Sequence, residues 1–302
     1  MRCAGCPFVF LGPVAAFTAS ATWAFATTRY SRASREVGSA RVNLARAIVA
    51  TSAFAALRLA TGGGPLMSGL TIGAASWLVL SIVCSYALGD SLFLTASRRV
   101  GVTTALSIAS TYPLWAALWG TVIDREPLGA LRGAGMLLAV GGVTWLVRLG
   151  RGDGGAEANR RDRGGIALAL VTSLFWAFNS IGIKRGSVGM NLLDVNVFRF
   201  GAAFLLLLPQ LRFPAERARA ASPGGGWRSL LPALLVDCVL GSLSYVYGLA
   251  HTDLAVGATL SSLAPLISVP FAIAAGEDRF DARRLAAIAA TVSGVALLVV
   301  RC

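Results

Sequence analysis

Apolar residues are arranged along this chain in long uninterrupted runs, a pattern that leaves few folds open to it. Ten such runs follow one another, and each is close to the roughly 20 residues that an α-helix needs to cross about 30 Å of hydrocarbon. The runs cover residues 8–28, 42–60, 72–96, 102–122, 130–149, 165–183, 193–211, 229–250, 254–275 and 283–300. We therefore expect an all-α integral membrane protein with ten transmembrane helices.

Charged residues are too scarce for a soluble domain. Hydrophobic residues make up 56% of the 302 residues and charged residues only 14%, whereas roughly a quarter of a soluble protein is charged. The net charge of +13 would favour nucleic acid as the partner of a soluble protein. In a membrane protein it is typical of cytoplasmic loops that face anionic headgroups, so we expect the lipid bilayer and no nucleic acid as partner.

The metal-ligating residue types do not form a site pattern. Cys3 and Cys6 have the spacing of half a zinc site, but no second cysteine pair follows and His251 is the only histidine. The chain also has no glycine-rich nucleotide loop that would let ATP drive it directly. We expect no metal and no cofactor.

An internal duplication divides the chain. At a constant offset of 153, the residues around Trp23 match those around Trp176, and Arg46 falls on Arg199. The charged, glycine-rich segment 150–164 separates a first repeat, 1–149, from a second, 165–302. Because each half holds an odd number of spans, the halves enter the membrane in opposite orientations, which predicts two five-helix inverted-topology repeats.

These paired residues give the chain a resemblance to the EamA-type drug/metabolite transporter superfamily, whose ten-helix carriers contain two EamA repeats. The resemblance covers nearly the whole chain and also rests on the run from Leu260 to Pro265. Glu126 and Glu277 match the family's Gly-Glu-Arg signature in part. The resemblance implies a carrier of amino acids, other metabolites or drug-like solutes, often outward. The glutamate mechanism of four-helix multidrug members does not carry over, because the first and sixth spans contain no acid.

Four of the charged side chains within the predicted spans, where each costs about 2.5–3.5 kcal/mol to insert, are candidates for a functional role. They are Arg46, Arg199, Asp90 and Asp237. At 1.5 Å per residue, the first arginine and both aspartates lie roughly 7–12 Å deep from the same face, whereas Arg199 enters from the opposite face. Two interpretations stay open: structural anchors and ion pairs, or a substrate path with a titrating coupling site.

Aromatic and amide groups supply further candidates for lining the path of an organic solute, although helix packing or an interfacial belt explains them equally well. These candidates are Trp23, Trp176, Asn179, Tyr112, Asn43 and Asn196. Pro113 and Pro265, which match at an offset of 152, lie deep in the fourth and ninth spans. Each removes a backbone donor and frees a carbonyl, so we treat them as candidate hinges whose alternative role is helix shape.

These patterns predict a secondary transporter and not an enzyme. By resemblance it is an exporter of small organic metabolites or drug-like solutes across the cell membrane, working by alternating access. A channel or a membrane receptor scaffold is the alternative, and a membrane lipid enzyme is less favoured because it would need clustered acids or several histidines. When every Lys and Arg except Arg46 and Arg199 is assigned to a connection or a terminus, 18 lie in the odd-numbered connections and seven elsewhere, which predicts both termini outside. A homodimer stays open.

Overall fold

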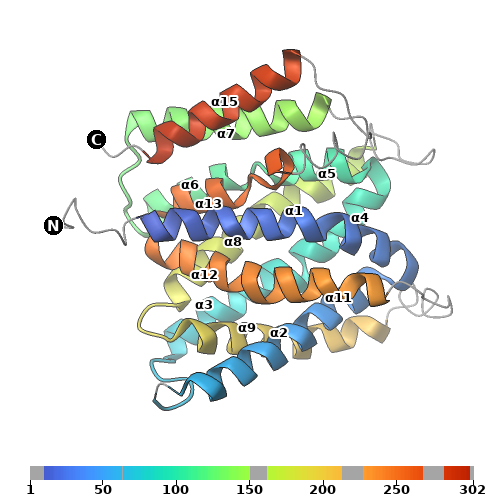
Figure 1. The fold of residues 1–302 in the computed structure, drawn as a ribbon, viewed down its shortest axis with the longest axis vertical. Coiled ribbons are helices and arrows are strands. Elements are labelled where there is room, and N and C mark those ends of the chain that lie inside the picture. The colour runs from blue at the N-terminus through green and yellow to red at the C-terminus, as the bar shows by residue number, and fades with distance from the viewer. Residues whose placement is uncertain (1–9, 63, 150–161, 213–226, 268–281, 300–302) are drawn as a thin grey trace.

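The computed structural model describes residues 10–62, 64–149, 162–212, 227–267 and 282–299, and within these ranges the chain is helical with no strand. The helices run back and forth beside one another in Figure 1. Helices α7 and α15 pack together at one edge of the molecule, and α2 and α9 pack together at the other.

The bounds of the helices in the first half follow the apolar runs closely. They are α1 (Leu11–Val37), α2 (Ser39–Thr61), α3 (Ile72–Ile82), the π-helical segment η2 (Val83–Ala87), α4 (Gly89–Val100), α5 (Val102–Ala109), α6 (Tyr112–Ile123) and α7 (Ala130–Leu149).

The second half repeats this order. Its elements are α8 (Arg163–Gly186), α9 (Leu192–Leu207), the 3-10 segment η3 (Leu208–Arg212), α11 (Trp227–Leu235), the π-helical segment η4 (Val236–Gly241), α12 (Ser242–His251), α13 (Leu254–Ser261) and α15 (Ala282–Val299). His251 is the last residue of α12.

Polar side chains define where three helices begin. Thr71, Asp162 and Asn191 accept hydrogen bonds from first-turn backbone N–H groups of α3, α8 and α9. Such caps satisfy donors that have no partner within the helix. The polar residues between apolar runs therefore do more than separate the helices.

Helical irregularities recur at equivalent positions of the two halves. The π-helical segments begin at Val83 and Val236, which are 153 residues apart. The fourth apolar run breaks between α5 and α6 at Ser110, and the ninth breaks after α13 at Ser262 before helix resumes at Ala264. Because π-bulges and broken helices leave backbone groups outside the regular ladder, they commonly accompany functional sites.

Contacts between helices are reciprocal with respect to the duplication. Helix α1 packs on α11, α12 and α13, and its counterpart α8 packs on the equivalent helices α3, α4 and α5. The equivalent pairs α2–α9 and α7–α15 contact each other directly. A two-fold relation between the halves produces this pattern. When a helix of one half contacts a helix of the other half, the counterparts of these two helices then contact each other in the same way.

The pair α7–α15 depends on close approach of two backbones. A Cβ atom added at Gly142 would lie 2.4 Å from Thr291 Oγ1, and one added at Gly294 would lie 2.4 Å from the backbone nitrogen of Ala139. Small residues allow such approach in membrane helices. Gly142 and Gly294 stand 152 residues apart, so the contact is another product of the duplication.

The outer surface is apolar. Ile72, Leu59, Leu205 and Val122 expose 65–89% of their area, which a soluble protein avoids on this scale but lipid favours. Five helical stretches of the described chain are long and apolar enough to cross a membrane: Ser39–Thr61, Ile72–Val100, Arg163–Gly186, Leu192–Arg212 and Leu230–His251. Ala130–Trp145, Leu254–Ile267 and Leu285–Leu297 are apolar but shorter.

Candidate functional site

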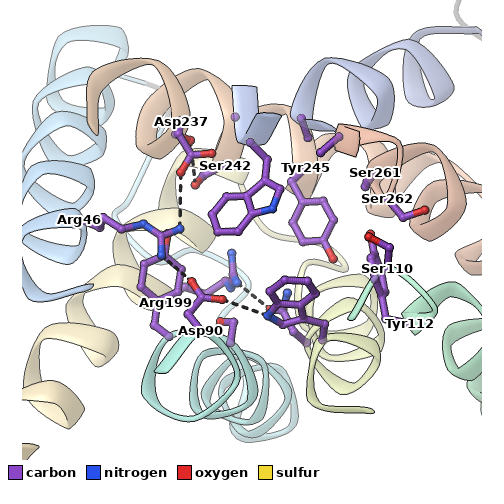
Figure 2. A pocket seen from close by; sticks show the side chains of 18 of the residues that line it. Arg46, Asp90, Ser110, Tyr112, Arg199, Asp237, Ser242, Tyr245, Ser261 and Ser262 are labelled. Carbon is purple, nitrogen blue, oxygen red and sulfur yellow. Dashed lines mark hydrogen bonds and ion pairs between the residues drawn. The ribbon is translucent and has the colours of Figure 1, made fainter. Parts of the chain in front are cut away.

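A cavity lies where the two halves meet. A water-sized molecule can reach about 130 Å³ of it, and its empty space amounts to about 810 Å³ when the part open to the outside is counted. Its walls come from both repeats: Ala19, Trp23, Arg46, Ser85, Tyr86, Asp90, Leu106, Ser110, Tyr112, Trp176, Asn179, Arg199, Phe200, Asp237, Gly241, Ser242, Tyr245, Ser261, Ser262 and Ala264. Figure 2 shows the charged groups Arg46 and Asp237 on one side and the hydroxyls of Ser110, Ser261 and Ser262 on the other.

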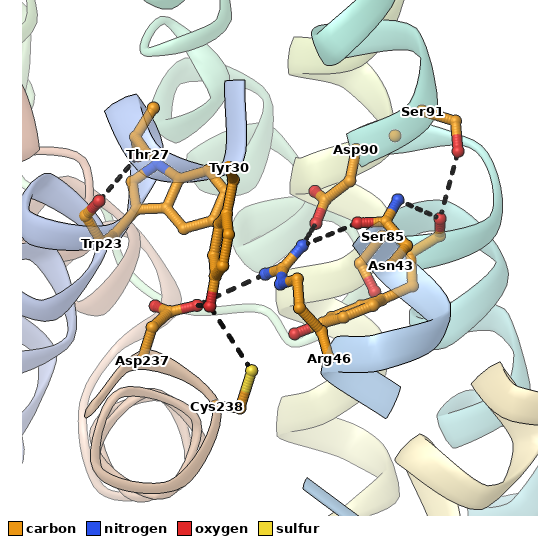
Figure 3. Close-up of polar contacts among 12 residues, drawn as sticks. Trp23, Thr27, Tyr30, Asn43, Arg46, Ser85, Asp90, Ser91, Asp237 and Cys238 are labelled. Carbon is orange, nitrogen blue, oxygen red and sulfur yellow. Dashed lines mark hydrogen bonds and ion pairs between the residues drawn. The ribbon is translucent and has the colours of Figure 1, made fainter. Parts of the chain in front are cut away.

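Arg46 lies between two carboxylates. Its Nη1 donates to Asp90 Oδ2 at 2.5 Å, and its Nη2 lies 3.5 Å from Asp237 Oδ2. Asn43 Oδ1 accepts a further hydrogen bond from Nη1 at 3.0 Å. Figure 3 shows the guanidinium held between the acids, one from each half of the chain. The depth estimate from sequence groups these three charges in the same way, although their role stays a prediction.

Aromatic groups complete the surroundings of this guanidinium. Its central carbon lies 4.2 Å from the ring centroid of Tyr86, 4.6 Å from that of Tyr30 and 5.3 Å from that of Trp23. Tyr30 Oη also donates to Asp237 Oδ2 at 3.1 Å. Rings stabilise a desolvated cation through their π faces, so this charge is compensated by carboxylates and rings together.

Arg199 occupies the equivalent position of the second half but has neutral partners. Its Nε donates to Ser81 Oγ and its Nη2 to Asn179 Oδ1, both at 2.9 Å. Within the described chain, no carboxylate forms an ion pair with it. The residue is 3% exposed and borders the cavity. The two arginines thus differ in charge compensation.

Trp176 contacts both an acid beside Arg46 and the aromatic side chains that border the cavity. Its Nε1 donates to Asp90 Oδ1 at 3.0 Å, and its ring meets that of Trp23 edge-on with 6.1 Å between the centroids. Tyr112 lies 6.0 Å from the ring of Trp176 and donates from Oη to the carbonyl of Ala258 at 2.8 Å. These three aromatic residues all border the cavity.

The two candidate asparagines do not line this cavity, and their assignment to the path stays a prediction. Asn43 supports Arg46 and donates from Nδ2 to the carbonyl of Tyr86 at 3.2 Å. Asn196 is fully buried and donates to the carbonyl of Leu192 at 2.9 Å. Each stands one helical turn before its arginine, but helix rotation directs it into the protein. Asn179 lines the cavity instead.

Neither candidate hinge proline lies in the middle of an unbroken helix. Pro113 stands in the first turn of α6, directly after the break at Ser110 and Thr111. Pro265 follows the break at Ser262 in the same way. Proline is tolerated in a first turn because its missing N–H would have no partner there. Whether these breaks act as hinges stays a prediction.

Sequence reasoning missed one buried ion pair entirely. Arg58 was counted with the connections, but it is 2% exposed and its Nε lies 3.0 Å from Asp194 Oδ1. It also donates to the carbonyls of Gly62 and Gly64. Tyr30 and Tyr86 were missed as well. The signal for the pair was an acid in the first turn of α9 beside an arginine in the last turn of α2, elements that the repeat makes counterparts.

A second group of charges joins the two halves at one end of the helices. Lys184 Nζ lies 2.6 Å from Glu126 Oε1, and Arg185 Nε lies 2.6 Å from Asp124 Oδ1. Glu126 Oε2 also accepts from the backbone N–H of Leu254 at 2.7 Å. We call this end, where the second, fourth, sixth and eighth connections lie, the even face. These three contacts all run between the first repeat and the second.

Metal-binding sets are absent among the residues described: no three His, Cys, Asp or Glu side chains gather there as ligands. Cys84 and Cys238 are buried free thiols. Cys3 and Cys6 lie outside the described residues, as does Glu277.

Comparison with known proteins places this architecture among transporters. The profile of a family described as the EamA-like transporter family matches residues 10–148 and 163–300. A protein of Archaeoglobus fulgidus named an uncharacterized transporter is 28% identical over 200 residues, 66% of each chain. A solved structure titled only as the crystal structure of a protein superposes with a TM-score of 0.74 at 21% identity, covering 95% of this chain and 96% of that one. At this identity the last match supports the fold alone.

Proposed function

Because the chain belongs to the EamA-like transporter family, we propose that it is a secondary transporter that exports small organic solutes across the cell membrane by alternating access. Family membership makes it a multi-pass membrane transporter, with a small-molecule substrate and a lipid environment. The export direction, the mechanism and the class of solute are the parts that we propose.

The proposed topology has ten spans in two inverted repeats. It is supported by the two family matches, by the reciprocal helix contacts and by the recurrence of π-helical segments and helix breaks. An odd number of spans in each half would invert the second half relative to the first. We further propose that both termini are outside, as the distribution of Lys and Arg predicts. Labelling of Cys302 with an impermeant maleimide only after the cells are permeabilised would overturn this orientation.

One observation carries the proposed substrate site: a cavity at the junction of both repeats combines aromatic walls with buried charges of both signs. Transporters with internal repeats bind substrate at the repeat interface, where broken helices and side chains from both halves converge. Flat apolar walls with a few polar groups suit an organic solute. Buried charges in membrane spans commonly mark substrate or ion pathways.

The even face supplies a physical basis for alternation. The pairs Glu126–Lys184 and Asp124–Arg185 hold the two halves together there, and all four side chains are partly exposed. Ion pairs at such exposure contribute on the order of 1 kcal/mol each, so they can break and reform during transport. We propose that these pairs close this side of the cavity in one state of the cycle.

Counterflow in proteoliposomes tests the proposal. Vesicles containing purified full-length protein are loaded with an unlabelled extract of the small solutes that producing cells export, and each labelled component is supplied outside. A carrier accumulates label transiently above equilibrium, because the unlabelled solute leaves through the same alternating site. Simple equilibration of every labelled component would instead indicate a channel.

Charge exchange at the even face provides matched variants for the same assay. Asp124→Arg places like charges beside Arg185 and should slow counterflow by lowering the population of the closed state. The double exchange Asp124→Arg with Arg185→Asp restores the pair and should restore the rate. If both variants exchange solute at the rate of the unaltered protein, these contacts do not take part in alternation.

A further inference from the structure

The cavity contains one buried cation whose hydrogen-bond partners in the described chain are neutral, and Asp90 acts on it only at longer range. Arg199 is 3% exposed, and the acceptors that it contacts are a serine hydroxyl and an amide oxygen. A buried charge is costly unless a counter-charge compensates it. Arg46, by contrast, already has Asp90 and Asp237. The second guanidinium is therefore the group in the described cavity that an anion would stabilise.

The hydrogen-bonding capacity of Arg199 also leaves room for a ligand. A guanidinium carries five N–H donors, of which Nε–H and one Nη2–H are used by Ser81 and Asn179. The two N–H groups of Nη1 are among the donors that remain. In the described chain, some buried polar atoms have no hydrogen-bond partner, and Nη1 is not one of these atoms. A carboxylate accepts from two such donors in a forked geometry.

The walls around this position define the rest of the ligand. Trp176, Tyr112 and Tyr245 border the same cavity as Arg199, and the rings of the first two meet edge-on. Flat aromatic side chains favour a flat apolar body. The nearby carboxylates of Asp90 and Asp237 would repel a second negative charge, which disfavours a dianion such as a phosphate monoester.

We propose that Arg199 is an anion-binding subsite that takes the carboxylate of an organic monocarboxylate with a flat apolar body. This inference rests on the proposed function, since it names the class of solute for the same cavity. Ser81 and Asn179 orient the guanidinium, and the aromatic wall contacts the body of the solute. Arg199 of the second repeat thus supplies recognition, whereas Arg46 of the first repeat is compensated by one acid from each repeat.

Three probes that share one body test the proposal: 3-phenylpropanoate, the neutral 3-phenylpropanol and the cationic 3-phenylpropylamine. Their binding to purified full-length protein in nanodiscs is followed by tryptophan fluorescence, because Trp23 and Trp176 border the cavity. A charged hydrogen bond contributes about 1.5–3 kcal/mol, so the carboxylate should bind about 10- to 150-fold more tightly than the alcohol. Arg199→Gln should reduce the carboxylate to the affinity of the alcohol and leave the alcohol unchanged.

Arg199→Lys keeps the positive charge but loses the forked pair of donors, so it should retain part of the preference for the carboxylate. This variant provides the test if Arg199→Gln does not fold. Equal affinities for the three probes, no saturable binding of the carboxylate, or an equal loss of all three in Arg199→Gln would overturn the subsite. Counterflow separates the two proposals. Counterflow without a preference for the carboxylate would overturn only the proposed subsite. Selective binding of the carboxylate without counterflow would overturn only the proposed carrier function.

Discussion

Arg46 and Arg199 are counterparts in the duplication, yet they have different surroundings. The first contacts Asp90 and Asp237 and lies against three aromatic rings. The second donates to a serine and an asparagine. Duplication therefore preserved the position of a cation while the compensation of its charge diverged. Arg46 is thus compensated by acids from both halves, whereas the described hydrogen-bond partners of Arg199 are neutral.

The difference between the surroundings of the two arginines comes from the two acids, because neither has an acid at the equivalent position of the other half. At an offset of 153, Asp237 corresponds to Cys84, and at an offset of 152, Asp90 corresponds to Ser242. Each half therefore contributes one acid, and both reach the same arginine. The π-helical segments explain how both acids reach Arg46, because Asp237 lies within η4 and Asp90 lies just after η2.

The largest expected effect comes from removing the compensated cation. Arg46→Gln leaves two carboxylates facing each other in a buried site, and breaking a buried pair costs about 3–5 kcal/mol. We expect most of the protein to be lost as monodisperse material in size-exclusion chromatography. The triple variant Arg46→Gln, Asp90→Asn and Asp237→Asn removes all three charges and should recover folding.

Arg199→Gln is the matched control for this prediction. It removes a cation from neutral partners, so the folded yield should stay near that of the unaltered protein. An equal loss of folded protein in both single variants would remove the distinction between the two arginines and indicate that Arg199 has an acidic partner.

A second expected effect concerns the pH dependence of transport. If Asp90 and Asp237 are the coupling groups, Asp90→Asn should flatten the dependence of counterflow on pH, because an amide cannot exchange a proton. The groups that face these acids are Arg46, Tyr30 and Trp176. Arg199→Gln should keep the pH dependence of the unaltered protein. An unchanged profile in both asparagine variants would return the acids to a structural role.

The smallest expected effect is a difference in thermal stability between variants of Trp23 and Trp176, which occupy equivalent positions in the two halves. Trp176→Phe removes the donor to Asp90 Oδ1, and a hydrogen bond to a charged group is worth about 1.5–3 kcal/mol. Trp23→Phe removes no indole hydrogen bond seen in the described chain. Thermal unfolding followed by tag fluorescence should therefore show a larger decrease in melting temperature for Trp176→Phe. A larger decrease for Trp23→Phe would indicate that ring size, not the indole donor, dominates here.

Several features of this protein follow from its sequence alone. Long apolar runs require helices, because only internally hydrogen-bonded backbone is tolerated in hydrocarbon. The offset of about 153 residues identifies the two halves, and the family profile matches both of them. Rise per residue alone groups Arg46 with Asp90 and Asp237, since depth in a bilayer is nearly a linear function of position along a helix.

The tertiary structure decided the rest. It turned Asn43 and Asn196 away from the cavity, brought Tyr30 and Tyr86 against Arg46, and buried Arg58 beside Asp194. It also put both prolines after helix breaks. These outcomes depend on how each helix is rotated about its axis and which neighbour it crosses. Side-chain packing sets those rotations through many weak contacts between distant segments, so the spacing of residues along one helix does not contain them.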